Sequence, residues 1–144
     1  MQLNYRKATQ SDYSCIYEIQ KKYVLRFEDQ TIVNIKDILE RIEMNLKANL
    51  ETYTCVLQDE EVIGYYRIEE DYDFFYDLSF LYVNKEYRRI GIGSQIIDYI
   101  KKDCDDAIQA NVIMKDTILC SFLEKNSFSI KRVVSKSRMV LEFR

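Results

Sequence analysis

Apolar residues recur at helical spacing in two stretches near the start of the chain. Ile16, Ile19 and Tyr23 form the first stripe, and Thr9-x-x-Asp12 ahead of them has the spacing of a capping box in which Thr9 accepts bonds from free amides. Asn34 is suited to cap a second helix, whose stripe consists of Ile35, Ile38, Leu39, Ile42 and Leu46. The pattern predicts two amphipathic helices, and we interpret both stripes as core.

The pattern then changes to segments rich in Val, Ile, Thr and Tyr, which is typical of strands. Residues 52–58 and 62–69 are two such strands, with Asp59-Glu60-Glu61 as the hairpin turn between them. An acidic tip, residues 70–73, leads into a third strand at 74–83, and residues 2–7 alternate enough to form an opening strand.

After a glycine-containing segment the chain alternates between helices and strands. We expect helices at 94–106 and 117–125 and strands at 107–113, 128–134 and 138–143. The predicted order is β-α-α-β-β-β-α-β-α-β-β, which indicates an α/β fold with a twisted, mixed sheet of about seven strands and helices on both faces. No repeat, linker or proline interrupts the chain, so we expect a single domain over residues 1–144.

Composition excludes several classes of protein. The 144 residues carry a net charge of −3 without a basic stripe, which argues against a nucleic-acid partner. The start of the chain lacks a signal peptide and no apolar run could span a membrane, so we expect a cytoplasmic protein without a membrane partner. A homodimer is compatible with these features.

The side chains also limit the chemistry. There is no histidine, and no two of the four cysteines form a C-x-x-C pair, which argues against a metal site and against a Ser-His or Cys-His nucleophile. We interpret all four cysteines as reduced thiols that pack as small hydrophobic residues.

Two of the three glycines, Gly91 and Gly93, stand between a predicted strand and a predicted helix. Bare backbone at a helix start can bind an anion, because the first amides are unpaired and the helix dipole favours negative charge. The alternative is a tight turn in which the glycines only relieve strain. A dinucleotide fingerprint fits less well, since Ile96 stands where it needs a small residue, and a Walker sequence is absent.

Arg88-x-x-Gly91-x-Gly93 resembles the Arg/Gln-x-x-Gly-x-Gly/Ala signature of the GNAT acetyltransferase superfamily. Other segments resemble the family in the same order along nearly the whole chain: Arg6-x-Ala8-Thr9-x-x-Asp12, Val62-Ile63-Gly64-Tyr65, Leu81-Tyr82-Val83 and Glu124-Lys125-Asn126-Ser127-Phe128, where Ser127 replaces a glycine. The shared order and spacing make this resemblance specific.

The resemblance implies that acetyl-CoA binds in a V-shaped gap between the strands at 74–83 and 107–113. A bulge near Leu81 and Tyr82 would open this gap and free main-chain groups of Leu81 and Val83 for the pantetheine arm. The amides from Arg89 to Ser94 would hold the pyrophosphate. The implied cofactor-binding set is Leu81, Tyr82, Val83, Arg88, Arg89, Ile90, Gly91, Ile92, Gly93 and Ser94.

In this family the amine usually attacks the thioester directly, so an amine of pKa about 10.4 must first lose a proton, at a cost of about 4.6 kcal/mol at pH 7. We nominate Asp77 as the base, because it interrupts an apolar strand at a position where several family members carry a catalytic glutamate. The alternative is an aspartate that points to solvent. Glu69 is the reserve candidate, acting through water.

A general acid would contribute less, about 2 kcal/mol for a thiol of pKa about 8.5. Many family members carry a tyrosine just before the Glu-Lys pair, where this chain has Leu123. Tyr82, Tyr76 and Cys120 are the substitutes, with Tyr82 taken as the catalytic candidate.

We expect an N-acetyltransferase for a primary amine of a small molecule or peptide. A non-catalytic acyl-CoA-binding module and an interaction domain that has lost the cofactor are the alternatives. The acidic residues Glu69, Glu70, Asp71 and Asp73 either attract a cationic amine or form a solvated hairpin.

Overall fold

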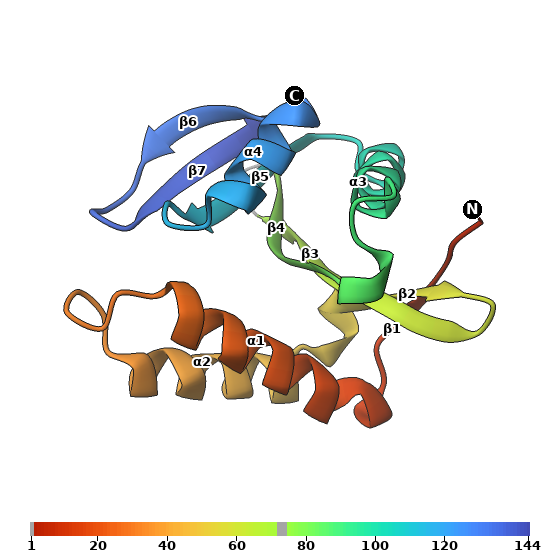
Figure 1. Cartoon of the computed structure of the whole chain (residues 1–144), viewed down its shortest axis with the longest axis horizontal. Coiled ribbons are helices and arrows are strands. Elements are labelled where there is room, and N and C mark those ends of the chain that lie inside the picture. Colours follow the sequence, from red (N-terminus) through yellow and green to blue (C-terminus); the bar gives the residue numbers. More distant parts are fainter. Residues whose placement is uncertain (1, 72–74) are drawn as a thin grey trace.

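The helices and strands follow in the order that the sequence pattern predicts. In this computed structural model the described residues are 2–71 and 75–144. The elements are β1 (Asn4–Lys7), α1 (Tyr13–Phe27), α2 (Ile35–Ala48), β2 (Tyr53–Gln58), β3 (Glu61–Asp71), β4 (Phe75–Val83), α3 (Ile92–Asp103), β5 (Ala107–Ile113), α4 (Thr117–Lys125), β6 (Ser129–Val133) and β7 (Arg138–Phe143) (Figure 1).

Some boundaries differ from the prediction. The β2–β3 hairpin turns on two residues, Asp59 and Glu60, both with positive φ (49° and 71°), and Glu61 already belongs to β3. Helix α3 begins two residues earlier than expected, because Gly91 in a left-handed conformation serves as its N-cap. The predicted positions of Asp73 and Phe74 lie outside the described residues.

All seven strands form one sheet in the order β1-β2-β3-β4-β5-β7-β6. The β4–β5 pair is parallel and the other neighbouring pairs are antiparallel. The expected mixed α/β sheet is therefore confirmed. A parallel pair needs a crossover, and α3 supplies it between β4 and β5.

Helices cover both faces of the sheet, with α1 and α2 side by side on one face and α3 and α4 on the other (Figure 1). The larger core cluster joins the α3–α4 side to the sheet and includes Ile92, Ile96, Ile100, Leu123 and Leu141. The smaller cluster on the other face includes Ile16, Leu46, Tyr53, Cys55 and Tyr65. Among the described residues, none of the helices combines the length and the hydrophobicity that a membrane span requires.

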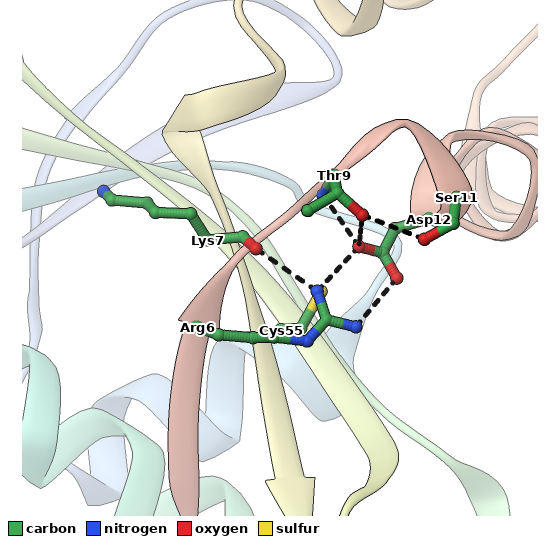
Figure 2. A network of polar contacts seen from close by, with 6 residues as sticks. All are labelled: Arg6, Lys7, Thr9, Ser11, Asp12 and Cys55. Atoms are coloured by element: carbon green, nitrogen blue, oxygen red, sulfur yellow. Dashed lines mark hydrogen bonds and ion pairs between the residues drawn. The ribbon is translucent and has the colours of Figure 1, made fainter.

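A polar network joins β1 to the start of α1 (Figure 2). Arg6 Nη1 and Nη2 donate to the two carboxylate oxygens of Asp12, at 2.8 and 3.2 Å. Asp12 Oδ2 also accepts from Thr9 N–H at 2.8 Å, so the predicted capping box is present, at a single 3₁₀ turn (Gln10–Asp12) ahead of α1. Arg6 Nη1 lies 3.4 Å from Cys55 Sγ on β2. The network anchors α1 to the sheet edge.

Helix α4 ends in a Schellman motif that uses a serine where glycine is usual. Ser127 N–H donates to Glu124 O (3.1 Å) and Phe128 N–H to Leu123 O (3.0 Å), and Ser127 has φ 73°. Phe128 and Leu123 pack together in the larger core cluster. Ser127, the left-handed residue, therefore stands at the position where the similar segment of the GNAT family has glycine.

Candidate active site

Strands β4 and β5 run side by side for a short distance and then separate. Their parallel pairing covers Phe75–Ala107, Tyr76–Ile108 and Asp77–Gln109, and no later pair is formed among the described residues. Beyond this point β4 continues to Val83 against β3, and β5 continues to Ile113 against β7. The sheet is thus split along the carboxyl-terminal parts of its two central strands.

A β-bulge accompanies the split. Arg67 pairs with Phe80 and Ile68 with Leu78, so Ser79 is the additional residue in β4. The expected bulge is present, but it lies at Ser79, earlier in β4 than the predicted position near Leu81 and Tyr82. Its position follows from strand pairing, which the sequence of β4 alone does not reveal.

Main-chain groups of Leu81 and Val83 are directed away from β3. Asn84 N–H donates to Ile63 O (2.7 Å), so Asn84 and Ile63 form a hydrogen-bonded pair. In an antiparallel ladder, hydrogen-bonded pairs alternate with non-hydrogen-bonded pairs. Val83 and Leu81 occupy the non-bonded positions, opposite Gly64 and Tyr66, and their peptide groups face the side that β5 has left.

The segment between β4 and α3 presents a series of open amides. No described residue accepts a hydrogen bond from the backbone N–H groups of residues 89–94, and Gln95 N–H is the first to bond back, to Gly91 O at 3.0 Å. Arg89 (φ 63°) and Gly91 (φ 86°) are left-handed, an arrangement that curves successive amides around a common centre. The α3 dipole adds partial positive charge at the same place.

Glycine is suited to these two positions of the segment for different structural reasons. A Cβ atom at Gly91 would meet nothing within 4 Å, so the positive φ of 86°, and not crowding by other residues, favours glycine there. A Cβ atom at Gly93 would lie 3.0 Å from the Phe122 ring, so Gly93 allows α3 to approach α4 closely. That Gly91 leaves room for an anion stays a prediction, whereas Gly93 has a packing reason of its own.

Arg88 and Arg89 are both exposed but are placed differently. Arg88 Nε donates to Val83 O at 2.8 Å, and its guanidinium lies 5.3 Å from the Tyr82 ring centroid. Arg88 therefore braces the loop against the end of β4, whereas Arg89 has no hydrogen-bond or ion-pair partner among the described residues.

Asp77 is half-buried in β4, at the last residue pair before the strands separate. Its carboxylate has no hydrogen-bond partner among the described residues. Burial raises the pKa of the Asp77 carboxyl above its ordinary value; Arg67 opposes this, and Glu69 and Asp71 reinforce it. A carboxylate without a partner and with a raised pKa is suited to accept a proton.

A sequence profile described as the Acetyltransferase (GNAT) family matches residues 11–128. The chain belongs to this family. The GNAT domain makes it an acyltransferase by family, as the signature at residues 88–93 implied.

Solved acetyltransferase structures share the fold at low sequence identity. An acetyltransferase from Thermus thermophilus aligns with a TM-score of 0.76 and 14% identity, over 99% of this chain and 97% of that one. A PaiA N-acetyltransferase from Thermoplasma acidophilum in complex with coenzyme A aligns with a TM-score of 0.69 and 18% identity, over 100% and 99%. A GNAT acetyltransferase from Staphylococcus aureus Mu50 gives 0.72 and 18%, over 98% of each chain. No curated protein matched the sequence.

Two other predicted catalytic residues of this GNAT domain, Glu69 and Tyr82, lie at different distances from Asp77. Glu69 is its Cα partner on β3, is exposed, and forms an ion pair with Arg67 at 3.2 Å. Tyr82 is half-buried on the same strand, five residues or about 16 Å further along. Asp77 and Tyr82 therefore lie at opposite ends of the split.

The alternative proton donors are less accessible. The Tyr76 hydroxyl donates to Asp105 (2.9 Å), which raises the pKa of Tyr76 to about 12. Burial raises the pKa of the Cys120 thiol. Leu123, at the position where many GNAT members have tyrosine, is 1% exposed and belongs to the core.

Two polar residues beside Asp77 were not predicted as site residues from the sequence. Gln109 is its Cα partner on β5, is buried, and donates to Glu142 Oε1 at 3.4 Å. Arg67 donates from Nε to Thr52 Oγ1 at 2.8 Å and lies over the Tyr53 ring. Both interrupt apolar strands, which is the signal that singled out Asp77 and could have found them too.

Proposed function

We propose that this GNAT protein is an acetyl-CoA-dependent N-acetyltransferase that transfers an acetyl group directly to a primary amine of a small molecule or peptide. The observation that carries the proposal is the split that opens after the three β4–β5 pairs, together with the loop of open amides that follows the end of β4 at Val83. This combination offers unpaired strand edges for a thioester arm and an anion site where β4 ends.

The residues present fit a CoA pyrophosphate. Six consecutive amides, from Arg89 to Ser94, lack acceptors among the described residues, and the space outside Gly91 is open. Arg89 can add a charge-assisted bond. The peptide groups of Leu81 and the N–H of Val83 face the split, while the Val83 carbonyl accepts from Arg88. The bound acetyl-CoA would supply the acetyl group as an activated thioester.

Asp77 is the base in this proposal. It accepts a proton from the amine as the amine attacks the thioester; forming the free amine from an ammonium of pKa about 10.4 costs about 4.6 kcal/mol at pH 7. The raised pKa of Asp77 brings its basicity closer to the working pH, and Glu69 beside it can relay a proton through water. The leaving thiolate, where about 2 kcal/mol is at stake, takes its proton from solvent in this proposal, because Tyr82 lies about 16 Å along β4 from Asp77.

The test is release of free CoA from acetyl-CoA with a panel of amines: polyamines, amino acids, amino-acid amides and short peptides. We expect turnover with at least one class and none without amine. Binding of acetyl-CoA without turnover on any amine would instead support the non-catalytic module, and absence of both binding and turnover would overturn the proposal.

A further inference from the structure

The first half of helix α1 is fixed to the part of the sheet that contains β1 to β4. The helix begins beside β1 and ends on the side of β6 and β7 (Figure 1). Ile16 lies in the smaller core cluster with Tyr53 of β2 and Tyr65 of β3. Gln20 Oε1 accepts from the Tyr53 hydroxyl at 3.3 Å. Since these contacts do not involve β5, β6 or β7, the first half of α1 belongs to one side of the split.

The second half of α1 is bonded to the other side of the split. The Tyr23 hydroxyl donates to Asp116 Oδ2 at 2.6 Å. Arg138 Nη2 donates to Oε1 of Glu28, the C-cap residue of α1, also at 2.6 Å. Asp116 follows β5 and caps α4, whereas Arg138 begins β7 and pairs with Ile113 at the end of β5. Both bonds therefore connect α1 to the carboxyl end of β5.

These two bonds lie far from the pairs that join β4 to β5. The pairing ends at Asp77 and Gln109, and Ile113 lies four residues further along β5, which corresponds to about 13 Å. The two parts of the sheet are thus joined by backbone pairing at the amino ends of β4 and β5. On the α1–α2 face they are joined again by α1 at the carboxyl end of β5. The width of the split between these two joints depends on both.

The bonds at the end of α1 are strong but leave one polar atom unsatisfied. Asp116 is 7% exposed and the Glu28 side chain 1% exposed, and bonds to buried carboxylates are among the stronger hydrogen bonds. Glu28 Oε2 is buried and has no hydrogen-bond partner among the described residues, which is unfavourable. Opening of this contact would expose Oε2 to water and so recover part of the free energy that breaking the bonds costs.

We propose that Tyr23 and Glu28, with their partners Asp116 and Arg138, form a latch that holds the split at the width that CoA requires. The inference rests on the proposed function, because it takes CoA as the ligand of the split. With the latch closed, the edges of β4 and β5 are positioned before CoA binds, so less conformational entropy is lost on binding. With the latch open, CoA must restore this arrangement. Latch closure and CoA binding therefore favour each other.

The affinity of CoA for two variants, measured by calorimetric titration, tests the latch. Tyr23→Phe removes a hydrogen bond at the end of α1, and Asp12→Asn weakens the network at its start. We expect Tyr23→Phe to raise the dissociation constant of CoA about tenfold, and Asp12→Asn to leave it unchanged. Equal affinity in Tyr23→Phe and the parent, or equal losses in the two variants, would overturn the latch.

Hydrogen exchange of the ligand-free protein tests the latch without CoA. In Tyr23→Phe the amides at 111–116 and 138–141 should exchange about tenfold faster than in the parent, because they lie in the part that the latch holds. The amides of β2 and β3 should change much less. An equal change in β2, β3, β5 and β7 would indicate general destabilisation and overturn the latch. If Tyr23→Phe fails to fold, Arg138→Lys takes its place in both measurements, since it loses the guanidinium geometry but keeps the charge that Glu28 needs.

The two measurements separate this inference from the proposed function. A parent protein that binds no CoA would overturn the acetyltransferase proposal, and the exchange pattern would then decide the latch by itself. A parent protein that binds CoA no better than Tyr23→Phe does would leave the acetyltransferase proposal standing and overturn the latch.

Discussion

Single residues at the split between β4 and β5 carry most of the proposed chemistry. Asp77 combines partial burial, a carboxylate without a described partner and a position at the last β4–β5 pair. Gly91 combines a left-handed conformation with open space outside it. Asp77 is needed for its chemistry and Gly91 for its backbone conformation. Substitution of Asp77 should therefore affect acetyl transfer, and substitution of Gly91 should affect CoA binding.

Asp77→Asn should lower kcat by about a hundredfold or more, because general base catalysis contributes on that order, while acetyl-CoA affinity stays near the parent value. The acid limb of the pH–rate profile should also disappear, since a base of raised pKa must be deprotonated to act and activity therefore rises with pH through that pKa. Asp98→Asn, an exposed aspartate on α3, is the control. Superimposable profiles for Asp77→Asn and the parent would reject Asp77 as the base.

Gly91→Ala should weaken CoA binding about tenfold or more, because it places a methyl group in the open space outside the loop and strains a backbone with φ 86° by about 1 kcal/mol. Gly93→Ala is the comparison, since its methyl group meets the Phe122 ring. It should lower thermal stability more than affinity. Direct titration with CoA and thermal unfolding distinguish the two, and unchanged affinity in Gly91→Ala would contradict the anion site.

At the scale of elements, the ends of helices are held by specific bonds. The start of α1 depends on Asp12, which Arg6 and Thr9 both bind. The end of α4 depends on a left-handed Ser127. Each contact fixes the angle at which a helix leaves or meets the sheet. Removal of either contact should therefore lower the stability of the protein more than it lowers activity.

Asp12→Asn should lower the free energy of unfolding at pH 7 by about 2 kcal/mol. The Arg6 hydrogen bond holds the pKa of Asp12 at about 2, below its ordinary value. Because the folded pKa is depressed, this stabilisation is complete above the unfolded pKa, about 3.9, and is lost as the pH falls towards 2. Denaturant unfolding at several pH values measures it, with Asp98→Asn as the control. A gap between Asp12→Asn and the parent that stays constant down to about pH 2 would disagree.

Ser127→Gly should stabilise the protein by about 0.5–1 kcal/mol, because glycine adopts a positive φ without the strain of a side chain. The gain is reduced by the greater freedom of glycine in the unfolded chain. Ser121→Gly, inside α4 and exposed, should instead destabilise by a similar amount. A lower midpoint of thermal unfolding in Ser127→Gly would show that the serine makes a favourable contact that outweighs its strain.

At the scale of the whole molecule, the sheet consists of two parts joined at its centre by three residue pairs. One part is β1 to β4 and the other is β5, β7 and β6. A ligand in the split would contact β4 and the start of α3 together, so its binding should add order at the place where the sheet is least connected.

Addition of CoA should therefore slow hydrogen exchange of the amides at 81–83 and 89–94, whereas amides inside α1 should change little. At a CoA concentration about 100 times the dissociation constant, stability should rise by about 2.7 kcal/mol. Mass spectrometry measures the hydrogen exchange, and thermal unfolding measures the gain in stability. Protection spread evenly over the chain, or confined to α1, would place the ligand elsewhere.

The amino-acid sequence was enough to predict the element order, the mixed sheet and the glycine segment, because periodicity, capping residues and rare glycines are local signals. It also singled out Asp77 as a polar residue in an apolar strand. The tertiary structure decided the bulge at Ser79, the pairing of Asp77 with Gln109, and the bond between Glu28 and Arg138, 110 positions apart. Those contacts depend on strand order and register, which bring distant positions together and which no local pattern specifies.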